Sequence, residues 1–125
     1  MLIDTDVWVW YLRGNAKAER EIAQMRPRHM SCVSYMELLQ GVRDNRELSQ
    51  LREVMSELEA KMALLDETIS SKAFLLMEQY RLSHGLEMGD ALLGATALSK
   101  GWTLLTGNEK HYRMIPGLKI KKFRP

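Results

Sequence analysis

The fold of this chain is decided by its first residues, Met1-Leu-Ile-Asp4-Thr-Asp6-Val-Trp-Val-Trp-Tyr-Leu12. Residues 1–3 form an apolar run of the length of a short buried strand, and Asp4 ends that run. The residues that follow have apolar side chains at helical spacing. Ligands bind at the carboxyl ends of strands in an open α/β sheet, so Asp4 stands where a ligand or a metal ion would be held. Alternatively, an acid here only caps the helix, as Thr5 or Asp6 could also do.

The composition is that of one ordinary globular domain. The chain has 125 residues, 46% hydrophobic and 27% charged, and we expect residues 1–125 to form a single domain. Cys32 is the only cysteine, so an intrachain disulfide is excluded. We expect no leader, because the first strand starts at the first residues, and no membrane span, because no apolar run approaches the roughly 20 residues required. These features favour a cytoplasmic protein.

Positive charge is concentrated in two clusters. The net charge is +2 and the pI is near 8.8, which is compatible with a nucleic-acid partner but does not require one. The clusters are Arg26, Arg28 and His29, and near the end of the chain Lys119, Lys121, Lys122 and Arg124. A solvated surface is the simpler explanation for both.

Strand-like and helix-like segments alternate along the chain. We expect strands at residues 1–3, 30–33, 62–65, 102–105 and 118–120, and helices at 16–25, 34–42, 47–59, 67–84 and 90–98. Ser34 and Glu37 fit a capping box at the start of the second of these helices, and Leu82 is expected to face inward. This alternation predicts an α/β fold, a three-layer sandwich with a mostly parallel five-stranded sheet.

Three acids interrupt the apolar segments at related positions. Asp4 ends the first strand, Glu37 lies in the first helical turn after the second strand, and Asp90 opens the buried helix before the fourth strand. In a parallel sheet all three can converge on one edge, although each could instead be a helix cap. Clustered carboxylates repel one another and favour a bound cation. Their oxygens suit Mg²⁺ or Mn²⁺, whereas one cysteine and scattered histidines give no zinc spacing.

Four segments are typical, in their order and spacing, of one family. They are Leu2-Ile-Asp4-Thr-Asp6, Ser34-Tyr-Met-Glu37-Leu-Leu-Gln-Gly41, Asp90-Ala-Leu-Leu-Gly-Ala-Thr-Ala-Leu98 and Leu104-Leu-Thr106-Gly-Asn108. In this series the chain resembles the PIN-domain family and, more narrowly, the VapC-type toxins of toxin–antitoxin pairs. The resemblance covers essentially the whole chain.

The resemblance implies an endoribonuclease that depends on Mg²⁺ or Mn²⁺ and leaves 5′-phosphate and 3′-hydroxyl ends. By position, Asp4 and Asp90 would be the main metal ligands, and Glu37 would hold the metal or its water. Asn108 occupies the family's fourth position, where its neutral side chain adds no charge and makes a tightly held second metal doubtful. Asp6 could supply the missing charge or simply cap the helix.

The resemblance also implies partners. The substrate would be RNA, a tRNA or another structured RNA, with Arg13, Arg26, Arg28 and the C-terminal lysines available for its backbone. An antitoxin would neutralise the enzyme and could place an Arg or Lys in the acidic groove. Homodimers are common in the family. Apolar residues for protein contacts include Tyr35, Met36, Leu39 and the helix around residues 48–58.

Two other functions remain open from the sequence. Residues 2–7 also match the start of haloacid-dehalogenase-like phosphatases, in which the first Asp, here Asp4, is a nucleophile. Gly94 and Ala95 stand where that family's late motif requires a further acid. The second alternative is a catalytically inactive PIN-like module that binds RNA or protein, which Asn108 keeps open.

Overall fold

The protein has a central sheet of five parallel strands. The structure, a computed structural model, describes residues 1–125. The strands lie in the order β3-β2-β1-β4-β5, and each neighbouring pair is parallel. They are β1 (Leu2–Ile3), β2 (His29–Ser31), β3 (Lys61–Ala63), β4 (Leu104–Thr106) and β5 (Ile120–Lys122). The predicted α/β fold with a parallel five-stranded sheet is confirmed.

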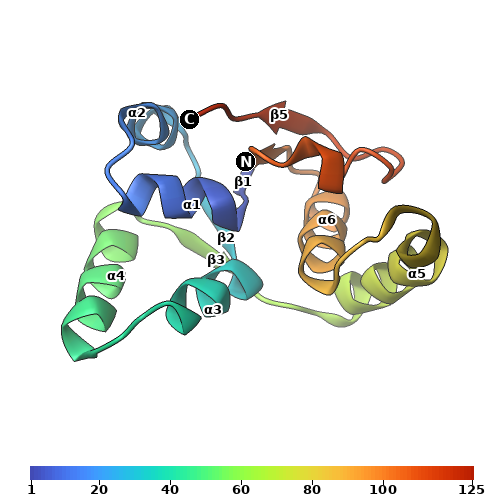
Figure 1. Ribbon diagram of the computed structural model, residues 1–125, viewed down its shortest axis with the longest axis horizontal. Coiled ribbons are helices and arrows are strands. Elements are labelled where there is room, and N and C mark those ends of the chain that lie inside the picture. The colour runs from blue at the N-terminus through green and yellow to red at the C-terminus, as the bar shows by residue number, and fades with distance from the viewer.

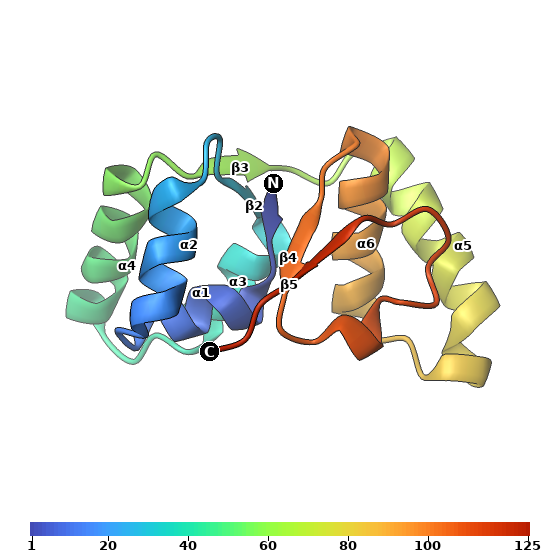
Figure 2. The ribbon, with the colours of Figure 1, turned by 90° about the horizontal axis from the view of Figure 1, so that it is seen from above.

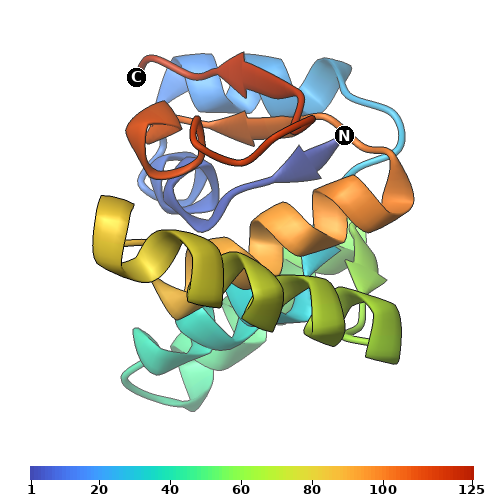
Figure 3. The same cartoon turned by 90° about the vertical axis from the view of Figure 1, so that its right-hand side faces the viewer.

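Helices cover both faces of this sheet. They are α1 (Thr5–Leu12), α2 (Ala16–Gln24), α3 (Cys32–Gln40), α4 (Asn45–Glu57), α5 (Glu67–His84) and α6 (Met88–Lys100), with a 3₁₀ turn η1 (Glu109–His111). Figures 1 and 2 show α1, α2 and α4 on one side of the strands and α5 and α6 on the other. Figure 3 looks onto this second side, where α5 lies outside α6. None of the helices combines the length and hydropathy that a membrane span requires.

Successive residues of β1 and β4 point to opposite faces of the sheet and belong to two separate hydrophobic cores. Successive strand residues point to opposite faces of a sheet. Leu2 of β1 and Leu104 of β4 belong to the cluster with α5 and α6, whereas Ile3 and Leu105 belong to the cluster with α1 and α2. All four side chains are completely buried. β1 and β4 are therefore strands covered on both faces, as is typical of a parallel sheet, whereas in the apolar run at residues 62–65 the side chains of Met62, Leu64 and Leu65 are exposed.

The strand order creates a switch point between β1 and β4. From β1 the chain first builds β2 and β3 on one side, and it then crosses to build β4 and β5 on the other side. At such a switch point the carboxyl ends of the two neighbouring strands, here β1 and β4, border a crevice. Asp4 follows β1 directly, and Gly107 and Asn108 follow β4.

Several local predictions were wrong. The predicted capping box does not form, because α3 begins at Cys32 and its cap is Ser31, whose Oγ accepts from the Val33 N–H at 3.1 Å. Ser31 is the last residue of β2 and pairs with Ala63 of β3. Because α3 begins at the next residue, Ser34 lies inside this helix, where its side chain is buried. Leu82 was expected inside but is 99% exposed.

Arg28 is a structural residue and not the RNA contact that its basic cluster suggested. Its side chain is buried, and its guanidinium donates to the carbonyls of Ile22 (2.6 Å), Leu58 (2.6 Å) and Ala23 (3.1 Å). These bonds tie the ends of α2 and α4 to the start of β2. In the C-terminal cluster, two lysines are occupied by ion pairs, Lys121 with Glu21 and Lys122 with Glu109.

We predict that Arg28→Ala lowers the free energy of unfolding by about 2–3 kcal/mol, because charged donors to buried carbonyls are lost together. Arg28→Lys should recover only part of this loss, since an ammonium group lacks the planar set of donors. Urea unfolding measures both, with the exposed Arg52→Ala as the control. Equal stability of Arg28→Ala and Arg52→Ala would contradict the structural role.

Candidate active site

The residues singled out in the sequence line one pocket. A cavity of about 550 Å³ lies at the carboxyl ends of β1 and β4, and its wall includes Asp4, Glu37, Asp90 and Asn108. Asp6 and His111 line it as well. We refer to this cavity as the acidic pocket. Elements from the beginning, middle and end of the chain contribute to it, because the switch point brings β1 and β4 together.

Asp4 is buried at the base of the acidic pocket and is held by two donors. It is only 6% exposed. Its Oδ1 accepts from the Thr5 N–H at 2.7 Å, and its Oδ2 accepts from the Thr106 hydroxyl at 2.7 Å. Burial raises the pKa of Asp4, and the hydrogen bond from Thr106 partly opposes that rise. Asp4 is also the N-cap of α1, so the capping and pocket positions coincide in one residue.

Asp6 connects α1 to the loop after β4. Its Oδ2 accepts from the Gly107 N–H at 2.9 Å, and its Oδ1 is buried without a hydrogen-bond partner. Burial, together with the nearby Asp4 carboxylate, raises the pKa of Asp6 to about 6. Neither Thr5 nor Asp6 caps α1, because Asp4 holds that position. Asp6 therefore has a structural role at the rim of the pocket and one unpaired oxygen.

Glu37 reaches the pocket from the first turns of α3. The Thr5 hydroxyl lies 2.9 Å from Oε1 of Glu37 and 2.8 Å from the Ser34 hydroxyl. A hydroxyl has one proton and a carboxylate can only accept, so Thr5 donates to Glu37 and accepts from Ser34. This chain of bonds orients an exposed carboxylate toward α1. It also explains the buried Ser34, which the sequence assigned to a cap.

Asp90 is held by two consecutive residues at the end of η1. The Tyr112 hydroxyl donates to its Oδ1 at 3.0 Å, and Nδ1 of His111 lies 3.2 Å from its Oδ2. Burial raises the pKa of Asp90, and the charges of Asp4 and Glu37 raise it further, against the hydrogen bond from Tyr112. Asp90 is not a helix cap, because α6 begins at Met88 with Glu87 before it.

Asn108 is held in place by a hydrogen bond of its backbone N–H group. Its N–H donates to the Thr106 hydroxyl at 2.9 Å, and the same hydroxyl donates to Asp4. Asn108 lines the acidic pocket beside Asp4 and Asp90 without adding a charge. The Thr106-Gly-Asn108 motif thus serves mainly to hold Asp4, with Thr106 as the central group.

Sequence reasoning missed four groups of the site. Thr5, Thr106, His111 and Tyr112 all make hydrogen bonds or close polar contacts to the acids. The two threonines lie in the quoted motifs, so a search for donors next to each acid would have found them. No pattern marks His111 and Tyr112, because their contact with Asp90 depends on the path of the chain after β4.

The donor set of the acidic pocket fits a hard cation. Only oxygen ligands converge there from the acids, which suits Mg²⁺ or Mn²⁺ more than zinc. Asp6 also leaves a buried oxygen unpaired. No three His, Cys, Asp or Glu side chains are already grouped closely enough to hold an ion between them. Mg²⁺ is commonly bound by one or two carboxylates with water completing its shell, so a pair such as Asp4 and Asp90 satisfies that chemistry.

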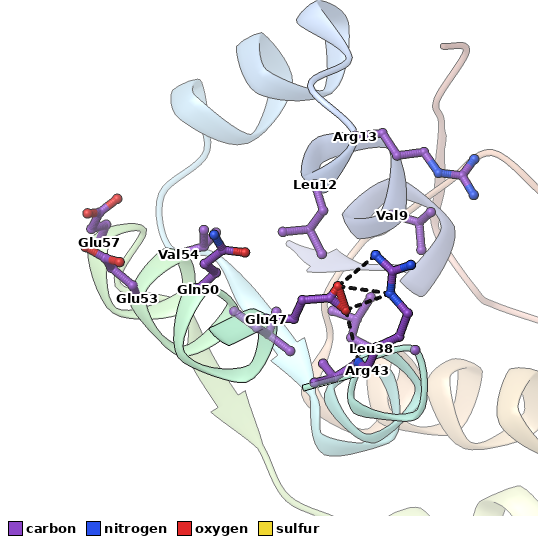
Figure 4. A pocket seen from close by; sticks show the side chains of 13 residues that line it. Val9, Leu12, Arg13, Leu38, Arg43, Glu47, Gln50, Glu53, Val54 and Glu57 are labelled. Carbon is purple, nitrogen blue, oxygen red and sulfur yellow. Dashed lines mark hydrogen bonds and ion pairs between the residues drawn. The ribbon is translucent and has the colours of Figure 1, made fainter. Parts of the chain in front are cut away.

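A larger groove lies beside the acidic pocket, between α1, α3 and α4 (Figure 4). Its volume is about 1000 Å³. Leu12, Leu38 and Val54 contribute its apolar wall, and Arg43 binds Glu47 at the rim through N–H···O distances of 3.1–3.2 Å. Val9 lines both cavities, so the groove leads toward the acidic pocket.

Comparisons with known proteins identify the family. The model of the PIN domain matches residues 1–115. Ribonuclease VapC10 of Mycobacterium tuberculosis is 34% identical over 124 residues, covering 95% of this chain and 90% of the relative. Ribonuclease VapC19 of the same organism is 35% identical over 122 residues, covering 94% and 95%. The chain therefore belongs to the PIN-domain family.

Solved structures agree with this fold. VapBC2 from Rickettsia felis, bound to a DNA fragment from its promoter, contains a chain with a TM-score of 0.83 at 17% identity, with 98% of each chain covered. A toxin-antitoxin complex from Klebsiella pneumoniae contains one with a TM-score of 0.79 at 23% identity, covering 94% of this chain and 93% of that chain. At these identities the likeness establishes the fold.

We predict that Gly107→Ala destabilises the protein by about 1–3 kcal/mol, because an added side chain overpacks the loop. Its Cβ would lie 2.5 Å from Oδ2 of Asp6 and 3.3 Å from the Phe123 carbonyl oxygen. Thermal unfolding measures the effect. The control is Gly89→Ala, whose Cβ would meet nothing closer than the Glu37 carboxylate at 3.9 Å. A Gly107→Ala variant as stable as the control would show that this loop is not tightly packed.

Proposed function

We propose that this protein is a metal-dependent endoribonuclease toxin, which hydrolyses RNA phosphodiester bonds and is neutralised by a cognate antitoxin. The observation that carries the proposal is the gathering of Asp4, Glu37 and Asp90 around one pocket at the switch point of the sheet. The relatives named ribonuclease VapC, similar along nearly the whole chain, support the nuclease activity and its RNA substrate. One sheet joins strands from residue 2 to residue 122, which supports treating residues 1–125 as a single PIN-like domain.

In this proposal Asp4 and Asp90 hold a Mg²⁺ or Mn²⁺ ion, and Glu37 contacts the ion or its water. A divalent cation in such a site neutralises charge that develops on phosphoryl oxygens and lowers the pKa of water. The raised pKa values of Asp4 and Asp90 support this role, because their burial and mutual repulsion are relieved by a cation.

The protein's own groups keep these ligands in place. Thr106 and the Thr5 backbone hold Asp4 at the base of the pocket, and the Thr5 hydroxyl orients Glu37. These bonds are already formed in the chain without substrate, and such preorganisation of the ligands favours electrostatic catalysis. The proposed products are a 5′-phosphate and a 3′-hydroxyl.

The neutral Asn108 at the fourth position favours one tightly held cation over two. It also keeps the inactive RNA- or protein-binding module as the second candidate, which a nuclease assay separates from the first. The phosphatase alternative has no support, because the chain belongs to a different family.

We propose the groove between α1, α3 and α4 as the contact surface for the antitoxin. It combines apolar side chains with the acids Glu53 and Glu57, while Glu47 is paired with Arg43, and this suits an apolar segment with basic residues. Because Val9 lines both cavities, a bound segment could extend a cation into the acidic pocket. The VapBC and toxin-antitoxin neighbours support such a partner. The proposed setting is the cytoplasm, and self-association of the free chain remains a prediction.

We predict that Asp4→Asn and Asp90→Asn each lower RNA cleavage by about 100-fold or more, because the pocket loses several kcal/mol of transition-state stabilisation. Purified protein is incubated with total RNA and Mg²⁺, Mn²⁺ or EDTA, and the cut ends are sequenced. EDTA should abolish cleavage by the unmodified protein.

The matched control for these variants is Asp66→Asn. Asp66 caps α5 outside the acidic pocket, and Asn is an equally good cap. Circular dichroism verifies that each variant folds. Undiminished Mg²⁺-dependent cleavage by folded Asp4→Asn or Asp90→Asn would refute the assignment, and metal binding without cleavage of any RNA would favour the inactive module.

We predict that Leu12→Asp weakens antitoxin binding by about 10-fold or more, because it places a charge in an apolar contact, while RNA cleavage is retained. Leu12 is 42% exposed and lines the groove. The control is Leu82→Asp on α5. Affinities for the cognate antitoxin are measured by calorimetry. Equal antitoxin affinity of the two variants would place the contact elsewhere.

A further inference from the structure

Tyr112 lies outside the lining of the acidic pocket, but its buried hydroxyl contacts Asp90, and no part of the proposed reaction uses it. The side chain is completely buried, and its hydroxyl donates to Oδ1 of Asp90 at 3.0 Å. A phenol keeps its proton at neutral pH, so the hydroxyl serves as a neutral donor to Asp90.

The ring of Tyr112 is fixed by its contact with α6. A Cβ added at Gly94 would meet Cδ1 of Tyr112 at 4.0 Å, so the ring lies close to the helix at that position. Gly94 is one turn after Asp90, and residues four apart share a helix face. The ring therefore lies beside this face of α6, inside the hydrophobic core that Tyr112 shares with Ala91 and Ile115, and its hydroxyl donates to Asp90. Packing in the core therefore fixes the position of the Tyr112 hydroxyl. His111, the other partner of Asp90, is exposed.

The hydrogen bond matters because Asp90 is under repulsion. Asp90 lines one pocket with the carboxylates of Asp4 and Glu37, and a half-buried carboxylate can relieve the repulsion between like charges by rotating toward water. A donor on Oδ1 opposes that rotation. A carboxylate oxygen has two lone pairs, so Oδ1 keeps one available for a cation while it accepts from Tyr112.

We propose that Tyr112 is a positioning residue, whose buried hydroxyl holds Asp90 beside Asp4 so that the two carboxylates can bind one divalent cation. This inference rests on the proposed function, because it requires that Asp4 and Asp90 bind a metal. Groups that hydrogen-bond metal ligands typically contribute about 10–100-fold to metal affinity.

The test is Mn²⁺ binding to the purified full chain, measured by isothermal titration calorimetry. Tyr112→Phe removes the hydroxyl and keeps the ring, so the dissociation constant for Mn²⁺ should rise by about 10-fold or more. RNA cleavage should recover as the Mn²⁺ concentration is raised, which a general loss of structure would not allow. Tyr80→Phe on α5, the same change outside the acidic pocket, should bind Mn²⁺ like the unmodified chain.

The outcomes separate this inference from the proposed function. If the unmodified chain binds no Mn²⁺, both fail. If it binds Mn²⁺ and Tyr112→Phe binds equally tightly, only the role of Tyr112 is overturned. If Tyr112→Phe does not fold, the unmodified chain is labelled with ¹³C at Cζ of its 4 tyrosines and titrated with Mg²⁺. The Tyr112 signal, assigned as the one retained in Phe variants of the other three, should then shift. An unchanged signal overturns the proposal.

Discussion

The structure depends on the hydrogen bond between Thr106 and Asp4, which joins the ends of the two central strands. A carboxylate that is almost completely buried is costly unless its oxygens are hydrogen-bonded. Thr106 supplies one donor from β4, and the first turn of α1 supplies the other. The same hydroxyl accepts from the Asn108 N–H, so it also shapes the loop that leads to η1. The fold can bury an acid at its switch point because this pairing compensates for the lost water.

The other acids of the acidic pocket are also held by polar partners, according to how deeply each is buried. Glu37 is exposed and has a single donor, Thr5, whereas Asp90 is more buried and has two partners on η1. Asp6 is the exception, because one of its oxygens is buried without a partner. The pocket thus has donors enough to keep its shape but no strong cation to neutralise it. This imbalance is what makes it suitable for a divalent ion.

The sequence predicted the sheet and the position of the acids because both follow from local pattern. Apolar runs such as residues 2–3 must be buried, and an acid directly after a strand, such as Asp4, meets acids in helices that begin at the same edge of a parallel sheet, such as Glu37 and Asp90. Predictions failed where several residues could play one role. Ser31 and Ser34 are equally good caps, and only the register with Ala63 selects Ser31. The burial of Arg28 and the contact of Tyr112 with Asp90 depend on tertiary packing, which no local pattern encodes.

The two ends of the chain meet in the acidic pocket, and this has a consequence for biosynthesis. Thr106 follows Asp4 by 102 residues, so it leaves the ribosome long after the acid to which it donates. A nascent chain that does not yet include β4 and Tyr112 lacks the Thr106 hydroxyl for Asp4 and the Tyr112 hydroxyl for Asp90. The pocket is therefore assembled only after β4 and Tyr112 have been translated, and a chain terminated before them would present its acids without these donors.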